Sequence, residues 1–141
     1  MRLYAESSAV LAWLLGEPAG EAARRALAEA ELVIASDLTL IECDRVLIRA
    51  QTQDEISEAE VSDRHALLNA AAGHWQVLRI DTEVVERARR SFPLEPIRTL
   101  DALHLASALV ARGSVPGLVL LTLDERIRNV GRRLGFQIPI N

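Results

Sequence analysis

One stretch of the sequence decides the fold most clearly, and it reads Leu118-Val119-Leu120-Leu121-Thr122-Leu123-Asp124. Its continuous apolar run is typical of a strand that is buried on both faces of a parallel sheet. A turn marked by glycine and proline precedes it, and a short arginine-rich segment up to about residue 134 follows it. We therefore predict a strand over 118–121 and then a helix that begins near Asp124.

Similar apolar segments precede this strand in the chain. We predict strands over 3–5, 32–35 and 76–80, and a possible edge strand at 137–138. The segments between them have helical periodicity or capping residues, which predicts six helices. Five of these cover residues 9–15, 18–31, 37–50, 57–73 and 99–112, and one more begins at residue 81 or 82. Ser7 and Ser8 are the expected caps of the first helix, and Thr99 is the expected cap of the helix over 99–112. Strands that alternate with helices predict an α/β fold: a three-layer sandwich with a central, mainly parallel twisted sheet of about four to five strands flanked by helices.

Length and composition limit the class of protein. The chain has 141 residues, of which 50% are apolar, and a mean hydropathy of +0.13. These values predict a single domain, 1–141, with a sizeable core, and no apolar run approaches the ~20 residues needed to cross a membrane. With Cys43 as the single cysteine and no secretory leader pattern, we expect a cytoplasmic protein.

The basic residues are all arginine. The sequence holds 16 arginines and no lysine against 20 acidic residues, for a net charge of −4. A P-loop and a Schiff-base enzyme both require lysine, and a phosphotransfer receiver normally has one beside its aspartates. The absence of lysine argues against all three classes, and the acidic balance argues against a bulk electrostatic grip on nucleic acid.

Four acids stand where the strands end or the following helices begin. They are Glu6, Glu42, Asp101 and Asp124. The carboxyl ends of parallel strands meet at one edge of a sheet, so the fold can bring these four together. Two carboxylates ~4 Å apart repel by roughly 4 kcal/mol at an effective dielectric of about 20. A cluster of four therefore implies protonation or a bound cation, and oxygen ligands favour Mg²⁺ or Mn²⁺, as in nucleases that use such ions.

Each acid also has an ordinary structural explanation. Glu42 follows Thr39 at capping-box spacing, Asp124 can cap a helix, and Asp101 gains from the dipole of its helix. Glu6 has no capping role to explain it when two serines follow, although it can simply be exposed to solvent.

Four motifs and their order along the chain resemble those of the PIN-domain family, and in particular those of the VapC-type toxins of bacterial type II toxin–antitoxin systems. The motifs are 3–11 (LYAESSAVL), 40–42 (LIE), 98–106 (RTLDALHLA) and 121–126 (LTLDER). The resemblance implies a Mg²⁺-dependent endoribonuclease, commonly dimeric and inhibited by a cognate antitoxin. It places Glu6, Glu42, Asp101 and Asp124 in a catalytic metal site, with Ser8 and Thr122 as supporting hydroxyls.

One residue departs from the family pattern. Glu6 stands where the family usually has aspartate, which lengthens the side chain by a methylene. Mg²⁺ demands near-ideal octahedral ligands, so we expect altered metal affinity or rate more than lost function. The alternative is a catalytically weakened PIN-fold protein that acts mainly as an antitoxin-binding module.

The remaining polar residues suggest smaller roles. We expect His104, three residues after Asp101, to pack near the site more than to act as a base, and Cys43 to be a core residue. RNA contacts have to come from arginine, and Arg98, Arg126 and Arg128 lie nearest the acids in sequence. Five aromatic residues are a poor supply of base-stacking surfaces. Burial in the core is sufficient to explain the apolar helix around Trp13, and the alternative is that part of it contacts a protein partner, such as an antitoxin segment or a second copy.

Overall fold

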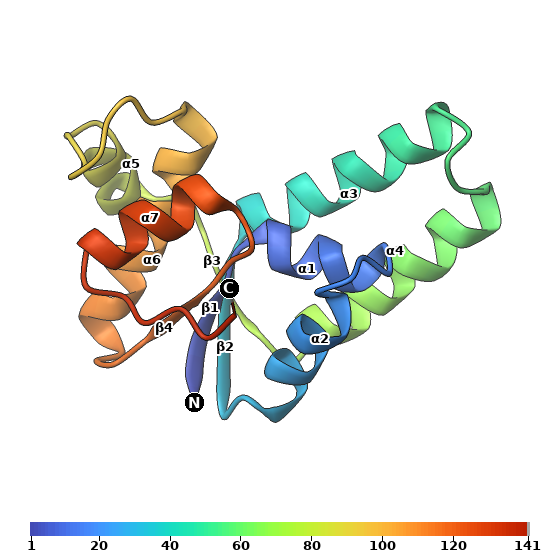
Figure 1. Cartoon of the computed structure of the whole chain (residues 1–141), viewed down its shortest axis with the longest axis horizontal. Coiled ribbons are helices and arrows are strands. Elements are labelled where there is room, and N and C mark those ends of the chain that lie inside the picture. Colours follow the sequence, from blue (N-terminus) through green and yellow to red (C-terminus); the bar gives the residue numbers. More distant parts are fainter. Residues whose placement is uncertain (141) are drawn as a thin grey trace.

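The computed structural model describes residues 1–140 (Figure 1), which form four strands and seven helices. The elements are β1 (Arg2–Ala5), α1 (Ser7–Leu14), α2 (Gly20–Glu29), β2 (Leu32–Ser36), α3 (Asp37–Thr52), α4 (Glu58–Ala72), β3 (Gln76–Leu78), α5 (Thr82–Ala88), α6 (Thr99–Ser114), β4 (Val119–Leu121) and α7 (Glu125–Arg133).

The four strands form one parallel sheet in the order β3-β2-β1-β4. Tyr4 of β1 is paired with Ile34 of β2 and with Leu120 of β4, so β1 is central. This confirms the predicted α/β class. The predicted edge strand at 137–138 is wrong, because this segment only accepts one hydrogen bond, from the backbone N–H of Leu120 to the carbonyl of Gln137 at 3.0 Å.

The core lies on both faces of the sheet. Alternate residues of each strand point to opposite faces, so Leu3 and Ala5 join the cluster under α1 to α4, whereas Tyr4 joins the cluster under α6 and α7. Figure 1 shows α1 to α4 on one side of the sheet and α5 to α7 on the other. Helices on both faces explain why the strands are apolar on both faces.

Two helix starts differ from the sequence prediction. Helix α1 begins at Ser7, with Glu6 as its N-cap, so the two serines lie inside the first turn. Helix α6 begins at Thr99, with Arg98 in the cap position. The helix starts predicted at 57 and at 81 or 82 agree with the structure: Ser57 and Asp81 are the N-caps, and each side chain accepts a hydrogen bond from the third backbone N–H that follows it.

Several boundaries are shorter than predicted. Helix α2 begins at Gly20 instead of Pro18, and β3 ends at Leu78 instead of residue 80. Helices α3 and α4 form a hairpin that extends away from the sheet (Figure 1). The carboxyl ends of β1, β2 and β4 lead directly into α1, α3 and the turn before α7, which puts the polar residues after these strands at one edge of the sheet.

No helix within residues 1–140 is long and apolar enough to span a membrane.

Candidate active site

Glu6 is a buried carboxylate at the end of the central strand. The residue is 3% exposed. Its Oε1 accepts hydrogen bonds from the hydroxyls of Ser8 (2.5 Å) and Thr122 (2.6 Å), and its Oε2 accepts from the Ser7 hydroxyl and the Ser8 backbone N–H, both at 2.9 Å. These donors compensate the cost of burying the charge. The expectation that Glu6 has no capping role is wrong, because its side chain caps α1.

Glu42 is joined to His104 across the two helices α3 and α6. Its Oε1 is hydrogen-bonded to Nε2 of His104, which is 2% exposed. The predicted capping box of Thr39 with Glu42 does not form: the Thr39 hydroxyl accepts from the Ser36 N–H at 3.4 Å and donates to the carbonyl of Ala5 at 3.1 Å. Glu42 is therefore oriented by the histidine and not by a helix end.

Ser7 lies between these groups. Its Oγ is 2.9 Å from Oε2 of Glu6, 2.8 Å from Oε1 of Glu42 and 3.0 Å from Nε2 of His104. A hydroxyl has a single proton to donate, so Ser7 can satisfy one carboxylate at a time. Ser7 was expected only as a helix cap, and its position directly after Glu6 is the one signal that would have found it.

His104 and Glu42 shift each other's pKa. Burial disfavours the imidazolium of His104, but its hydrogen bond to Glu42 and the nearby carboxylate charges outweigh burial and raise the pKa of His104. Burial also disfavours the carboxylate of Glu42, and the hydrogen bond with His104 outweighs it, so the pKa of Glu42 is lowered. The pair is thus stabilised as imidazolium and carboxylate.

Asp101 and Asp124 complete the group of acids. Asp124 caps α7, since its Oδ1 accepts from the Ile127 N–H at 3.0 Å; its ordinary role as a cap is confirmed. Burial raises the pKa of Asp101, and the negative charges of Asp124, Glu6 and Glu42 raise it further. The charges of the other three acids therefore act on Asp101, although the close group of ligand atoms found among residues 1–140 contains Glu6, Glu42 and His104 and not Asp101.

The two predicted supporting hydroxyls both lie in the site. Thr122 is fully buried, donates to Glu6 and accepts from the Asp124 N–H at 3.1 Å. The Ser8 hydroxyl donates to Glu6 and accepts from the N–H groups of Leu123 (2.9 Å) and Asp124 (3.1 Å). These bonds tie the end of β1 to the segment after β4.

The donor set fits a hard divalent cation. One carboxylate oxygen each of Glu6 and Glu42 and the Nε2 of His104 lie within 4.8 Å of one another, and burial, together with the charges of the other acids, raises the pKa of Asp101. Carboxylate oxygens suit Mg²⁺ or Mn²⁺. The four hydrogen bonds of Glu6 occupy all its lone-pair positions, so Glu6 can bind a cation directly only if a donor such as Ser7 turns to Glu42.

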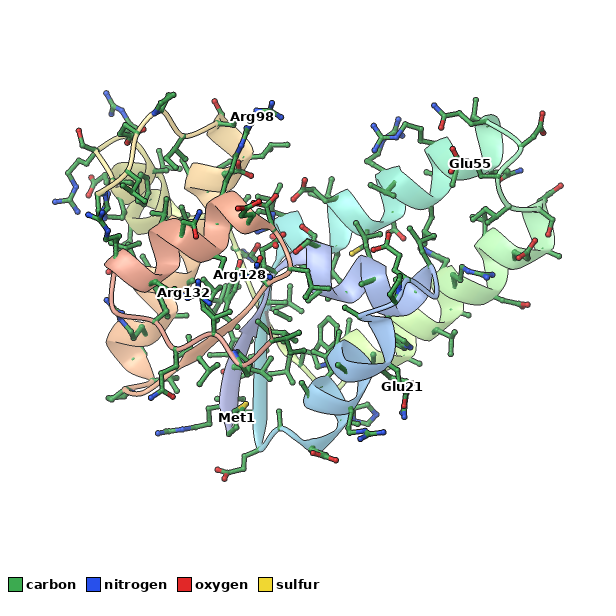
Figure 2. The ribbon with its side chains drawn as sticks, viewed as in Figure 1. Met1, Glu21, Glu55, Arg98, Arg128 and Arg132 are labelled. Atoms are coloured by element: carbon green, nitrogen blue, oxygen red, sulfur yellow. The ribbon has the colours of Figure 1, made fainter. Side chains whose placement is uncertain are left out.

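The three predicted RNA-binding arginines differ in their surroundings. Arg98 and Arg126 are exposed and line one groove with Asn129. Figure 2 shows Arg98 extending outward at the start of α6, whereas Arg128 lies toward the centre of the molecule. The Nε of Arg128 is buried without a hydrogen-bond partner among residues 1–140.

Two further expectations agree with the structure. Cys43 is fully buried, and burial together with nearby negative charge raises the pKa of its thiol, which makes it a poor nucleophile. His104 is a buried residue of α6, and its side chain is hydrogen-bonded to Glu42 near the site, as expected. Its direct bond to Glu42 depends on the packing of two distant helices and could not be predicted from the sequence.

A family model for the PIN domain matches residues 3–133. The chain belongs to the PIN-domain family. It is 34% identical over 136 residues to Ribonuclease VapC46 of Mycobacterium tuberculosis, an alignment that covers 96% of this chain and 95% of that protein. The resemblance to VapC-type members of the family is thereby confirmed.

Solved PIN-family structures share the fold. VapC20 of M. tuberculosis, a toxin that cleaves the sarcin–ricin loop, has a TM-score of 0.65 at 17% identity and covers 95% of each chain. VapBC2 of Rickettsia felis, solved with a DNA fragment from its promoter, has a TM-score of 0.64 at 9% identity over 98% of this chain and 97% of that one. A toxin–antitoxin complex from Klebsiella pneumoniae has a TM-score of 0.57 at 21% identity over 86% of each chain.

Proposed function

We propose that this chain is a Mg²⁺-dependent endoribonuclease toxin of a toxin–antitoxin pair, with Mn²⁺ able to substitute, that acts in the cytoplasm. One observation carries the proposal: a carboxylate oxygen of Glu6, a carboxylate oxygen of Glu42 and Nε2 of His104 lie within 4.8 Å of one another at the carboxyl edge of the sheet. The similarity to Ribonuclease VapC46 supports RNA as the substrate.

In this proposal Glu6, Glu42, Asp101 and Asp124 hold the cation. Mg²⁺, when bound, supplies positive charge that polarises the scissile phosphodiester and promotes attack by water. Glu6 is fixed by Ser8 and Thr122, and Glu42 is fixed by His104. Because the supporting groups are buried, the carboxylates are oriented before the cation arrives, which reduces the reorganisation that binding requires.

The test is RNA cleavage by purified protein with Mg²⁺ or Mn²⁺, for the wild type and Asp101→Asn. We expect EDTA-sensitive cleavage that falls by a factor of about 100 or more in Asp101→Asn, since the variant loses a ligand that holds the cation in place. Glu58→Gln is the matched control, because it also removes an acid from a first helical turn, at the start of α4 on the projecting hairpin.

Glu58→Gln should cleave like the wild type. Equal residual cleavage by the wild type and Asp101→Asn would indicate a contaminating nuclease and contradict the proposal.

A second candidate is a PIN-fold module with a weakened site that mainly binds antitoxin. The observation that favours it is the full occupation of the Glu6 oxygens by donors. Glu6→Asp separates the two candidates. A weakened site should gain cleavage when the family's usual residue is restored, whereas an already competent site should change little or lose activity.

A groove on the α1–α4 side is suited to the antitoxin. It has a volume of about 580 Å³ and is lined by apolar residues of α1, α2 and α4 that include Trp13, Leu27 and Leu67, with Trp75 beside β3. An amphipathic helix buries its apolar face in such a groove. The structural similarity to a toxin–antitoxin complex supports this partner, and co-purification with a small protein encoded beside this chain tests it.

A homodimer is the second proposed assembly. Ile41 and Ile48 of α3 are 54% and 44% exposed, and their spacing of seven places them on one face of the helix. Exposed aliphatic side chains on one helix face are typical of a protein contact. Sedimentation of the wild type against Ile48→Glu tests this assembly, since a charge on the shared face should leave a monomer.

A further inference from the structure

A groove between the starts of α6 and α7 is distinct from the acid cluster. It has a volume of about 490 Å³ and is lined by Leu94, Glu95, Pro96, Ile97, Arg98, Arg126, Asn129 and Val130. We propose that this groove binds one nucleotide of the RNA substrate, with its phosphate held by Arg98 and Arg126 and its base held on the apolar floor beside Asn129. The proposal rests on the ribonuclease function proposed above.

The charge of the groove favours an anion. Arg98 and Arg126 are exposed, and neither guanidinium group forms a hydrogen bond or an ion pair with any of residues 1–140. Glu95 is the one acid in the lining, and its two oxygens accept the N–H groups of Phe92 and Ile97, each at 2.8 Å. Two free guanidinium groups therefore face a groove whose carboxylate is already occupied, and guanidinium pairs well with phosphate.

The floor of the groove suits a base. Leu94 and Ile97 are partly buried and Val130 is 2% exposed, and all three pack on the core under α6 and α7. The loop that carries Leu94 and Ile97 is held by the hydrogen bonds of Glu95 and by Phe92, whose ring lies 4.3 Å from the guanidinium carbon of Arg87. A fixed apolar surface with an exposed amide at its rim, from Asn129, can hold a flat base and read its edge by hydrogen bonds.

The position of the groove relates it to the proposed reaction. Arg98 precedes the helix whose first turn carries Asp101, and Arg126 follows Asp124, the cap of α7, by two residues. A nucleotide bound here would therefore flank the scissile phosphate at the acids. Because the chain has only five aromatic residues for base stacking, an aliphatic pocket of this kind is the better candidate to hold a base.

Binding of RNA without metal tests the groove separately from cleavage. The probe is a fluorescein-labelled single-stranded RNA of ten nucleotides with mixed sequence, titrated in EDTA and followed by anisotropy. We expect Arg98→Ala and Arg126→Ala each to weaken binding by a factor of about 3 to 10, and to lower the salt slope by about one. Arg49→Ala, an exposed arginine of α3 outside this groove, is the charge-matched control and should bind like the wild type.

Cleavage with Mg²⁺ then tests the role of the base. Asn129→Ala should change which positions of a mixed RNA are cut while the melting temperature stays within about 1 °C of the wild type, because Asn129 is exposed. If Arg98→Ala and Arg126→Ala bind RNA as Arg49→Ala does, or if Asn129→Ala leaves the cleavage pattern unchanged, the groove is not a nucleotide site. If the wild type neither binds nor cleaves RNA, the proposed function itself fails.

Discussion

At the scale of single residues, the buried carboxylate of Glu6 depends on donors from distant parts of the chain. Ser8 belongs to α1, whereas Thr122 follows β4, and their hydroxyls converge on one oxygen at 2.5 and 2.6 Å. A buried carboxylate needs hydrogen-bond donors, and these two hydroxyls fix the orientation of Glu6.

Thr122→Val removes one donor and keeps the shape of the side chain. We expect the free energy of unfolding to fall by about 1–3 kcal/mol, because Glu6 and the Asp124 N–H both lose a buried partner. Urea denaturation measures this change. Thr52→Val is the control, since the Thr52 hydroxyl bonds to a carbonyl of its own helix at an exposed position, and its cost should stay near ~0.5 kcal/mol or less. Equal costs for the two variants would contradict the role given to Thr122.

The four acids illustrate what the sequence reveals at this scale. Their positions at strand ends or in the first turns of helices predict that they gather at one edge of the sheet. The same reasoning misplaced the caps, because a Glu directly before two serines can itself accept the first N–H groups of the helix. Which atom bonds to which depends on rotamers and helix packing, which no local pattern contains.

At the scale of elements, His104 and Glu42 join α6 to α3. Their bond is partly buried and lies near Glu6, whose Oε2 is 3.9 Å from Nε2 of His104. The raised pKa of His104 stabilises the fold fully below its ordinary value of 6.5 and ceases to do so as pH rises through the raised pKa. The lowered pKa of Glu42 stabilises the fold above its ordinary value of 4.5 and ceases to do so as pH falls through the lowered pKa.

The difference in unfolding free energy between the wild type and His104→Gln should therefore depend on pH. In EDTA we expect it to be largest between about pH 4.5 and 6.5, and to decline as pH rises beyond neutrality or falls into the acid range. Denaturant melts across this range measure it. His65→Gln removes an exposed histidine that bonds to Asp44 and serves as the control. A difference that is constant with pH would show that the two side chains are not an ion pair.

The order of the elements was predictable because strands buried on both faces are apolar throughout, and turns and caps separate them. The ends of short or partly polar strands were not predictable. The segment at 137–138 has a strand-like composition but makes a single backbone bond to β4, so it does not extend the sheet. Similarly, β3 stops at Leu78, although apolar Ile80 follows it. Pairing across the sheet, which is a tertiary property, decides such boundaries.

At the scale of the whole molecule, the net charge of −4 equals the formal charge of the four acids of the proposed site. Removing the four acids from the 20 leaves 16, which equals the number of arginines. A divalent cation at the cluster would compensate half of this charge locally, while Arg98 and Arg126 would provide positive charge beside it. An acidic protein can in this way bind RNA over a limited surface, with phosphate contacts made by arginine in the absence of lysine.

In the proposed function, the two grooves bind two different partners. The apolar groove with Trp13 and Trp75 lies over α1, α2 and α4 and suits a protein helix, whereas the groove with Arg98 and Arg126 lies between the starts of α6 and α7 and suits a nucleotide. The sequence predicted the apolar helix around Trp13 and the relevant arginines. It could not predict either groove, because each is formed by elements far apart in the chain.

The most direct test of the central claim is a titration of Mn²⁺ followed by electron paramagnetic resonance of the free ion. If Glu6, Glu42, Asp101 and Asp124 form one cation site, the wild type binds Mn²⁺ saturably, Mg²⁺ displaces it, and Asp101→Asn and Glu42→Gln raise the dissociation constant by a factor of about 10 or more, while Glu58→Gln leaves it unchanged. Wild-type protein that binds no Mn²⁺ saturably, or an Asp101→Asn variant that binds it as tightly as the wild type, would contradict the claim.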